Sequence, residues 1–266
     1  MATCSFNILS KTIGRHVTIN AFIPTLTAND VLEGKNPYSH QKKLKVLWLL
    51  HGFAGNQEDY FLYTNIARYA QSKNLAVIMP PAFNGGYSDL AATEKYMSFV
   101  AHELVEACAY LFPISTKQED MKLGGLSMGA MGAMKIAMTH PQQYSEVLCM
   151  SGVPYRADEE IQQLHWFGQD DSAFQGTIPG QGSQIKGTLD DAYYYACKNH
   201  QENTKMPRFY LTVGTNDFFL SKCQSAYSYL KDLSVDITYS ELEGFGHEWD
   251  FWDKQLRYAI ENWFML

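Results

Sequence analysis

One short strand–turn–helix segment limits the possible folds of this chain more than any other feature. The sequence predicts a buried strand over Met121–Leu126 and a helix over about Met128–Thr139, with the pattern G-x-S-x-G and Ser127 at the turn between them. A serine on such a turn holds its hydroxyl clear of the backbone, close to the free N–H groups that open the helix. We expect a Cβ at Gly125 or Gly129 to clash with neighbouring backbone. The segment therefore predicts a nucleophile, and a plain tight turn is the alternative.

Length and charge exclude several classes of protein. The chain has 266 residues, which suits a single domain over 1–266, and its 46% apolar and 18% charged residues are those of a globular protein. Its 21 basic and 28 acidic residues give a net charge of −7, which argues against a nucleic-acid partner. The apolar run at 44–50 is interrupted by Lys45 and is too short to span a membrane. We therefore expect neither a nucleic-acid partner nor a membrane partner.

The cysteines and the N-terminal residues bear on the compartment. Five scattered cysteines without C-x-x-C spacing indicate neither a disulfide framework nor a zinc site. Residues 1–20 lack the basic region and apolar core of a secretory signal, and the sequence contains no N-x-S/T glycosylation site. These features favour a cytoplasmic protein and leave open whether it forms a homo-oligomer.

Strand and helix patterns alternate from residue 44 to residue 264, after a predicted hairpin at 5–9 and 16–23 and a loop at 25–43. Such alternation is typical of a mostly parallel sheet with helices on both faces. The segment 154–207 interrupts it, because it contains no apolar run that would serve as a sheet strand. We expect a cap-like insertion there, over the carboxyl edge of the sheet, with helices at 158–164 and 189–200. The predicted strands are 44–50, 75–79, 121–126, 147–150, 208–213 and 235–242, and the predicted helices are 59–72, 93–112, 128–139, 218–233 and 248–264.

The carboxyl ends of two later strands supply an acid and a base. Open parallel sheets bind ligands at these ends. Asp217 follows a predicted strand and can hold a histidine in one tautomer, although capping the next helix is an alternative role. Asp236 and Glu243 are the fallback acids. His247 lies in a loop after the last strand, where a general base has the mobility to pass a proton.

The end of the strand at 44–50 supplies hydrogen-bond donors. A glycine-containing turn follows it, and we expect the N–H groups of Phe53 and Met128 to form an oxyanion hole. His51 is predicted to support this turn rather than to react. The pattern H-E-x-x-H of zinc enzymes fails after His247 because position 251 is Phe, so the sequence indicates no zinc-binding helix there.

The chain also resembles a known family. The resemblance covers about residue 44 to the end, apart from 154–207, and is to the esterase D branch of the α/β hydrolases, which includes tributyrin-type, acetylxylan and feruloyl esterases and S-formylglutathione hydrolases. It implies an α/β-hydrolase fold and a cofactor-free serine carboxylesterase for short acyl esters, with Ser127, Asp217 and His247 as nucleophile, acid and base. It is carried by Leu49-Leu50-His51-Gly52-Phe53-Ala54-Gly55-Asn56, Tyr63-Thr64-Asn65-Ile66, Gly125-Leu126-Ser127-Met128-Gly129 and Gly246-His247-Glu248-Trp249.

Several functions remain open within this resemblance. Acetyl or feruloyl esters of carbohydrates are candidate substrates, and a thioesterase or an acyltransferase would use the same groups. The turn after His51 differs from the H-G-L-T-C of S-formylglutathione hydrolases, which argues against glutathione thioesters. A non-catalytic binding protein of this fold is the alternative from another class. Trp166, in the aromatic insertion, is a candidate for stacking on the leaving group.

Overall fold

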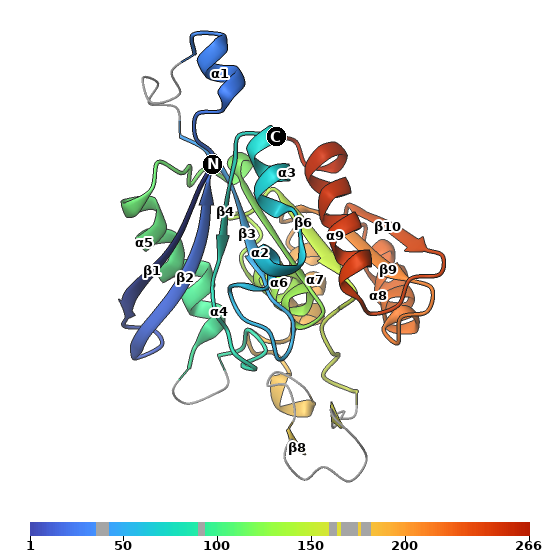
Figure 1. Ribbon diagram of the computed structural model, residues 1–266. Coiled ribbons are helices and arrows are strands. Elements are labelled where there is room, and N and C mark those ends of the chain that lie inside the picture. The colour runs from blue at the N-terminus through green and yellow to red at the C-terminus, as the bar shows by residue number, and fades with distance from the viewer. Residues whose placement is uncertain (36–42, 90–93, 160–163, 166–174, 177–181) are drawn as a thin grey trace.

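The computed structural model describes residues 1–35, 43–89, 94–159, 164–165, 175–176 and 182–266. An eight-stranded sheet with the order β1-β2-β4-β3-β5-β6-β9-β10 runs through the molecule (Figure 1). The first three strands of this order pair antiparallel, and all later pairs are parallel. The strands are β1 (Ala2–Ser10), β2 (Arg15–Ile23), β3 (Lys45–Leu50), β4 (Leu75–Met79), β5 (Met121–Leu126), β6 (Glu146–Met150), β9 (Arg208–Gly214) and β10 (Ile237–Leu242).

The order of the strands reverses around β3. From β3 the chain passes to β4 on one side and then returns to β5 on the other. In open α/β sheets, ligands bind in the crevice where the strand order reverses. The ends of β3 and β5 therefore define the position at which a site is expected, and both the Phe53 turn and Ser127 follow these two strands.

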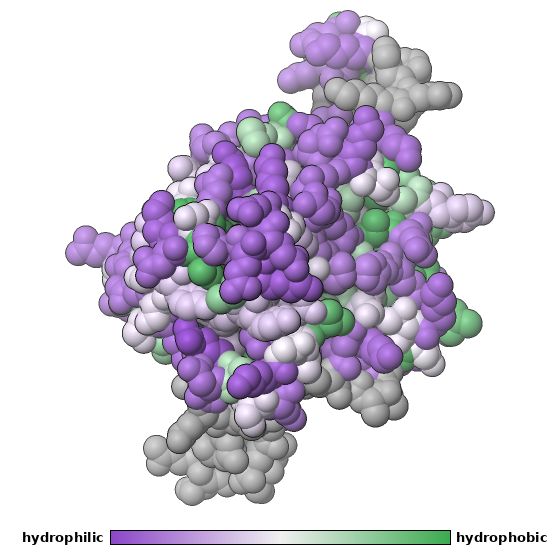
Figure 2. Space-filling model, turned by 180° about the vertical axis from the view of Figure 1, so that it is seen from behind, coloured by the Kyte–Doolittle hydropathy of each residue, from purple (hydrophilic) through white to green (hydrophobic). Residues whose placement is uncertain are grey.

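Helices cover both faces of the sheet, as the sequence predicted. In Figure 1, α3 (Ile66–Ser72) and α9 (Trp249–Tyr258) lie in front, and α6 (Met128–Thr139) and α7 (Ala192–Gln201) lie behind. Alternate residues of β3 enter separate apolar cores, with Trp48 in one and Leu49 in the other. Figure 2 shows that the outer surface of the rear layer is mostly hydrophilic. The remaining helices are α1 (Ala28–Leu32), α2 (Asp59–Tyr63), α4 (Tyr96–Ser98), α5 (Leu104–Leu111) and α8 (Leu220–Asp232).

Several predicted segments differ from the structure. The loop expected at 25–43 contains α1, which Thr27 and Asp30 cap reciprocally. The helix expected at 59–72 is divided into α2 and α3, because Thr64 is extended and the carboxylate of Asp253, in α9, accepts a hydrogen bond from the Asn65 N–H at 3.1 Å. The helix expected at 93–112 contains a π-helical turn at Phe99–Glu103.

The insertion departs from its prediction in one respect. Leu164, expected at the end of a helix, lies in the short strand β7 (Leu164–His165), which pairs antiparallel with β8 (Gln175–Gly176). Residues 160–163 of that expected helix lie outside the described residues. The second expected helix is confirmed as α7. Figure 1 places β8 beyond the carboxyl ends of the sheet strands.

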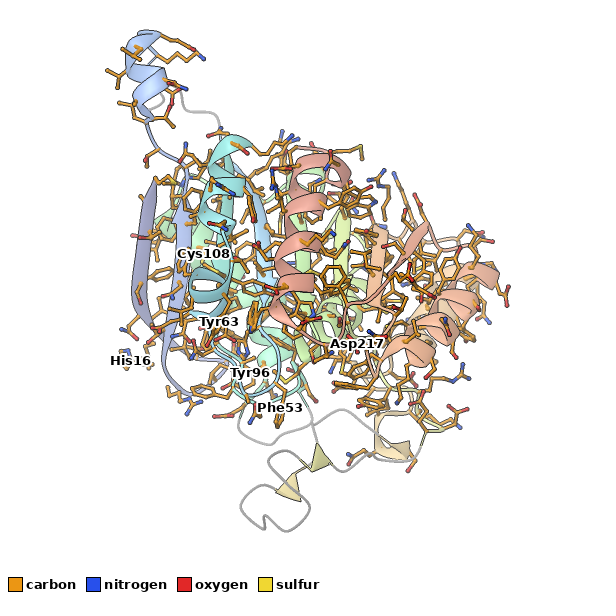
Figure 3. The ribbon with its side chains drawn as sticks, turned by 45° about the vertical axis from the view of Figure 1, so that its right-hand side comes forward. His16, Phe53, Tyr63, Tyr96, Cys108 and Asp217 are labelled. Atoms are coloured by element: carbon orange, nitrogen blue, oxygen red, sulfur yellow. The ribbon has the colours of Figure 1, made fainter. Side chains whose placement is uncertain are left out.

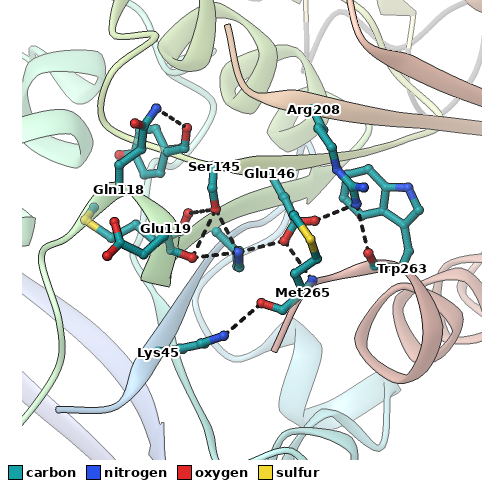
Figure 4. Close-up of polar contacts among 11 residues, drawn as sticks. Lys45, Gln118, Glu119, Ser145, Glu146, Arg208, Trp263 and Met265 are labelled. Atoms are coloured by element: carbon teal, nitrogen blue, oxygen red, sulfur yellow. Dashed lines mark hydrogen bonds and ion pairs between the residues drawn. The ribbon is translucent and has the colours of Figure 1, made fainter. Parts of the chain in front are cut away.

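The opposite, amino end of the sheet is closed by buried ion pairs (Figure 4). Glu146, at the start of β6, lies 2.6 Å from Lys122 Nζ of β5 and 2.6 Å from an Arg208 guanidinium nitrogen of β9. Its carboxylate also accepts a hydrogen bond from the Met265 N–H at 2.9 Å. One carboxylate thus joins three adjacent strands to the C-terminal segment. Within the described part of the chain, no helix is long and apolar enough to cross a membrane.

Candidate active site

Ser127 lies on a strained turn between β5 and α6. Its φ of +51° and ψ of −118° fall in a region that L-residues rarely adopt. A Cβ at Gly125 would lie 2.5 Å from the backbone of Gly129, and a Cβ at Gly129 would lie 2.1 Å from the carbonyl oxygen of Leu50. The expected clashes at both glycines are confirmed. This close packing holds the Ser127 turn against the end of β3 and directs the serine hydroxyl away from the backbone.

The structure brings together the three side chains that the sequence singled out. His247 Nε2 lies 3.0 Å from Ser127 Oγ, and His247 Nδ1 lies 3.0 and 3.1 Å from the two carboxylate oxygens of Asp217. Ser127 is 7% exposed and Asp217 5% exposed, so both residues that contact His247 are largely screened from water. The fallback acids Asp236 and Glu243 are exposed on the surface.

The surroundings of Asp217 favour its ionised form. Burial alone raises the pKa of this carboxyl, but hydrogen bonds from His247, the Phe219 N–H and the Ser151 hydroxyl, together with the His247 charge, lower the pKa below its ordinary value. Ser151 in turn accepts a hydrogen bond from the indole N–H of Trp252 at 3.0 Å. Asp217 is therefore held in one orientation toward His247. Ser151 was not predicted as a functional residue, since its place at the end of a strand was its one signal in the sequence.

The turn after β3 is fixed by His51. Its ring lies with Nδ1 2.7 Å from the Gly52 carbonyl oxygen and accepts a hydrogen bond at Nε2 from the Ala82 N–H, at 2.9 Å. Burial lowers the pKa of His51 to about 4, which the contact with Gly52 only partly offsets. A neutral imidazole satisfies both contacts at once, so His51 supports the turn that carries Phe53. Met128 opens α6, where a backbone N–H has no partner within its own helix.

A cavity of about 490 Å³ opens beside Ser127 and His247. Its wall contains the turn of Phe53 and the aromatic rings of Tyr63 and Trp249, which stack with centroids 4.8 Å apart. Figure 3 shows Phe53, Tyr63 and Asp217 at the same end of the molecule. The cavity is lined by Gly52, Phe53, Ala54, Gly55, Asp59, Tyr63, Leu126, Ser127, His247, Glu248, Trp249 and Trp252.

Three aromatic side chains lie around the histidine, and the most distant, Phe219, has its ring centroid 5.8 Å from that of His247. Phe218, 63% exposed, lies 4.4 Å from the His247 ring centroid, and Trp252 meets the same ring edge-on at 4.9 Å. Both were missed from the sequence, although Phe218 directly follows Asp217. Trp166, the expected stacking residue, lies outside the described residues. Among the residues that the structure describes, no group of His, Cys, Asp or Glu could hold a metal ion.

A serine on a strained turn at the centre of a mostly parallel sheet, with an acid and a histidine from later strand ends, defines a serine hydrolase of the α/β-hydrolase fold. The family described as "Putative esterase" matches residues 32–261. The chain therefore belongs to this esterase family, in the branch that the sequence resembled, and is a serine carboxylic ester hydrolase.

Individual relatives agree with this assignment. An acetyl esterase of Caldicellulosiruptor saccharolyticus is 29% identical over 271 residues, which cover 98% of this chain and 97% of the relative. The serine hydrolase FphF of Staphylococcus aureus, described as fluorophosphonate-binding, superposes with a TM-score of 0.82 at 29% identity, over 97% of this chain and 96% of that one. The S-formylglutathione hydrolase FrmB of the same organism gives 0.80 at 30% identity, over 97% of both chains.

Proposed function

We propose that Ser127, His247 and Asp217 form the catalytic triad of this esterase. His247 Nε2 takes the proton of the Ser127 hydroxyl as the serine oxygen attacks the acyl carbonyl carbon. His247 then donates this proton to the departing alcohol, which leaves an acyl-enzyme. Water, deprotonated by the same nitrogen, hydrolyses the acyl-enzyme and restores the serine. Asp217 holds Nδ1 and stabilises the imidazolium that forms in both steps.

We further propose that the N–H groups of Phe53 and Met128 bind the oxyanion. The Phe53 turn lines the cavity beside Ser127, and Met128 directly follows the nucleophile at the first turn of a helix. Helix N-termini favour developing negative charge. One such donor lowers the transition-state free energy by about 3 kcal/mol in other hydrolases.

The proposed substrates are esters of short acyl chains, with acetyl groups the first choice. The acetyl esterase of C. saccharolyticus supports this choice, because it aligns over almost the whole chain. The aromatic wall of the cavity suits a sugar or phenolic leaving group. The likeness to FrmB keeps thioester hydrolysis as the second candidate, and acyl transfer differs from hydrolysis only in the acceptor. Feruloyl esters are a weaker candidate, because a similarity of fold is their one support: a ferulic acid esterase superposes with a TM-score of 0.74 at 19% identity.

The organisation and the location of the protein are also proposals. Strand β8, within the segment 154–207, lies beyond the carboxyl ends of the sheet strands, which supports a single domain with a cap-like insertion. The cysteine pattern of the sequence supports a cytoplasmic location. Family membership assigns the chain to the enzymes and replaces the non-catalytic alternative.

One observation carries the proposed function, namely the 3.0 Å contact between His247 Nε2 and Ser127 Oγ. The test is turnover of 4-nitrophenyl acetate by the wild type and by Ser127→Ala. We expect kcat to fall by about 10³-fold or more, since removal of a triad member leaves only the residual catalysis of the oxyanion hole. Turnover by Ser127→Ala equal to that of the wild type would assign Ser127 to the turn alone.

A further inference from the structure

The cavity beside Ser127 carries negative charge without a matching cation. Among its described lining residues, the charged side chains are the acids Asp59 and Glu248, and no Lys or Arg is present. Glu248 is exposed and accepts a hydrogen bond from the Gly246 N–H at 2.8 Å. Asp59 is half-buried, so its charge is screened less by water than that of Glu248.

Asp59 shows no compensating partner among the described ion pairs. Burial raises the pKa of its carboxyl, the Asn56 N–H partly offsets this, and the neighbouring Glu58 raises the pKa further. The carboxylate is held against the turn, because a Cβ at Gly55 would lie 2.0 Å from its Oδ2. An acid kept partly desolvated in a catalytic cavity acts on any charge that a bound ester brings.

Two basic side chains that do not line the cavity, one after β6 and one in α8, are paired with acids. Arg156 pairs with Asp158 at 3.1 Å, and Lys222 pairs with Glu159 at 2.9 Å.

The aromatic part of the cavity suits uncharged and cationic groups. Tyr63, Trp249 and Trp252 line it, and the Trp249 ring meets the Trp252 ring edge-on at 5.1 Å. The faces of such rings attract ammonium groups and stack on uncharged rings, and they offer no counter-charge to a carboxylate.

We propose that this cavity selects esters by charge, and that Asp59 determines the selection. Esters that are uncharged or carry an ammonium group are accepted, and esters with a carboxylate near the scissile bond are rejected. Glutathione thioesters fall in the rejected class, because the two carboxylates of the peptide outnumber its one ammonium group and leave it a net anion. This inference rests on the proposed function, because it concerns the esters that Ser127 attacks.

The test compares kcat/KM within two pairs of nearly isosteric substrates. In the first pair, 4-nitrophenyl butyrate is compared with 4-nitrophenyl hemisuccinate, which has a carboxylate in place of the terminal methyl group. In the second, acetylthiocholine is compared with its uncharged analogue, 3,3-dimethylbutyl thioacetate. We expect the wild type to favour butyrate over hemisuccinate by about 100-fold and the ammonium thioester over its analogue by about fivefold.

Asp59→Asn removes the charge with little change of shape. It should reduce the butyrate-to-hemisuccinate ratio by about fivefold to tenfold and bring the ratio of the ammonium thioester to its analogue close to one. Glu58→Gln is the matched control, since it removes the same charge from the adjacent, exposed residue, which does not line the cavity. Ratios that stay unchanged in Asp59→Asn, or that change equally in Glu58→Gln, would overturn the proposal. So would a wild type that hydrolyses hemisuccinate as fast as butyrate.

Two further measurements distinguish charge selection from a folding defect of the variant and from a failure of the proposed function. For the wild type, the ratio of kcat/KM for butyrate to kcat/KM for hemisuccinate should fall as salt rises from about 0.01 M to about 0.5 M, because screening weakens charge interactions. A constant ratio would contradict the proposal even if Asp59→Asn failed to fold. Ser127→Ala should lose all four activities. If it retained them, the proposed function itself would be wrong, whatever the ratios in the Asp59 variant.

Discussion

Two buried carboxylates lie at opposite ends of the same sheet, and they are stabilised in different ways. Glu146, at the amino end, contacts two strongly basic side chains, Arg208 and Lys122, although burial lowers the pKa of Lys122 from its ordinary value of 10.5. Asp217, at the carboxyl end, has the imidazole of His247 as its titratable partner, with neutral donors around it. The charge balance around Glu146 does not depend on the protonation of a histidine. The charge balance around Asp217 changes each time His247 gains or loses a proton.

The difference relates charge pairing to function. A buried carboxylate that is matched by permanent cations connects strands, and removing one partner leaves an unpaired charge. A buried carboxylate beside a histidine can instead stabilise the imidazolium that forms when His247 accepts a proton. Substitutions at the two ends should therefore separate stability from activity.

The largest effect is expected from Asp217→Asn. Loss of the charge removes the stabilisation of the imidazolium and favours the wrong tautomer of His247, so kcat should fall by about 10³- to 10⁴-fold. Ester turnover and thermal unfolding of the purified variant, measured together, provide the check. A large loss of activity with a nearly unchanged Tm is the expected pattern, and full activity would transfer the acid role to another residue.

Glu146→Ala should have the reverse effect. It leaves Lys122 buried without its carboxylate partner, so we expect the free energy of unfolding to fall by about 3–5 kcal/mol. Urea unfolding measures this loss, and kcat of the folded fraction should stay within about twofold of the wild-type value. An active-site defect in a well-folded Glu146→Ala protein would show that the two ends are coupled.

His51 should make the catalytic end sensitive to acid. Its pKa is lowered to about 4 in the folded protein, against 6.5 as the ordinary value. The unfolded chain therefore takes up the proton first, and the free energy of unfolding should fall by about 3 kcal/mol from about pH 6.5 to about pH 4. His51→Gln should lack this part of the decline. Since His140 also has a lowered pKa and is present in both proteins, the difference between their pH profiles isolates His51.

Ser151→Ala should give the smallest effect. It removes the hydroxyl that donates to Asp217 and the acceptor of the Trp252 N–H. We expect kcat to fall about tenfold with little change in KM, and Tm to fall by a few degrees. Ser151→Gly also removes the hydroxyl but suits the φ of 54° at this position, so it should lose as much kcat as Ser151→Ala and less Tm. A kcat of Ser151→Gly close to that of the wild type would show that the hydroxyl does not support Asp217.

The sequence predicted the parts of the molecule that depend on local pattern. Buried strands have continuous apolar runs, and the Ser127 turn requires glycine at two fixed positions, so both were found from their residues. The division of α2 from α3 could not be found in this way, since it depends on Asp253, 188 residues beyond Asn65 in the chain. Asp59 was missed for a related reason, because its position in the cavity follows from tertiary packing.

The backbone of Ser127 has a further consequence, for the course of evolution. Its conformation costs about 1–3 kcal/mol in a residue that has a Cβ and much less in glycine. Ser127→Gly should therefore unfold at a higher temperature than Ser127→Ala, and selection for heat resistance alone would drive this position toward glycine. Serine persists there only in populations whose survival depends on the reaction, so the residue at 127 records whether a descendant of this protein is still under selection as a catalyst.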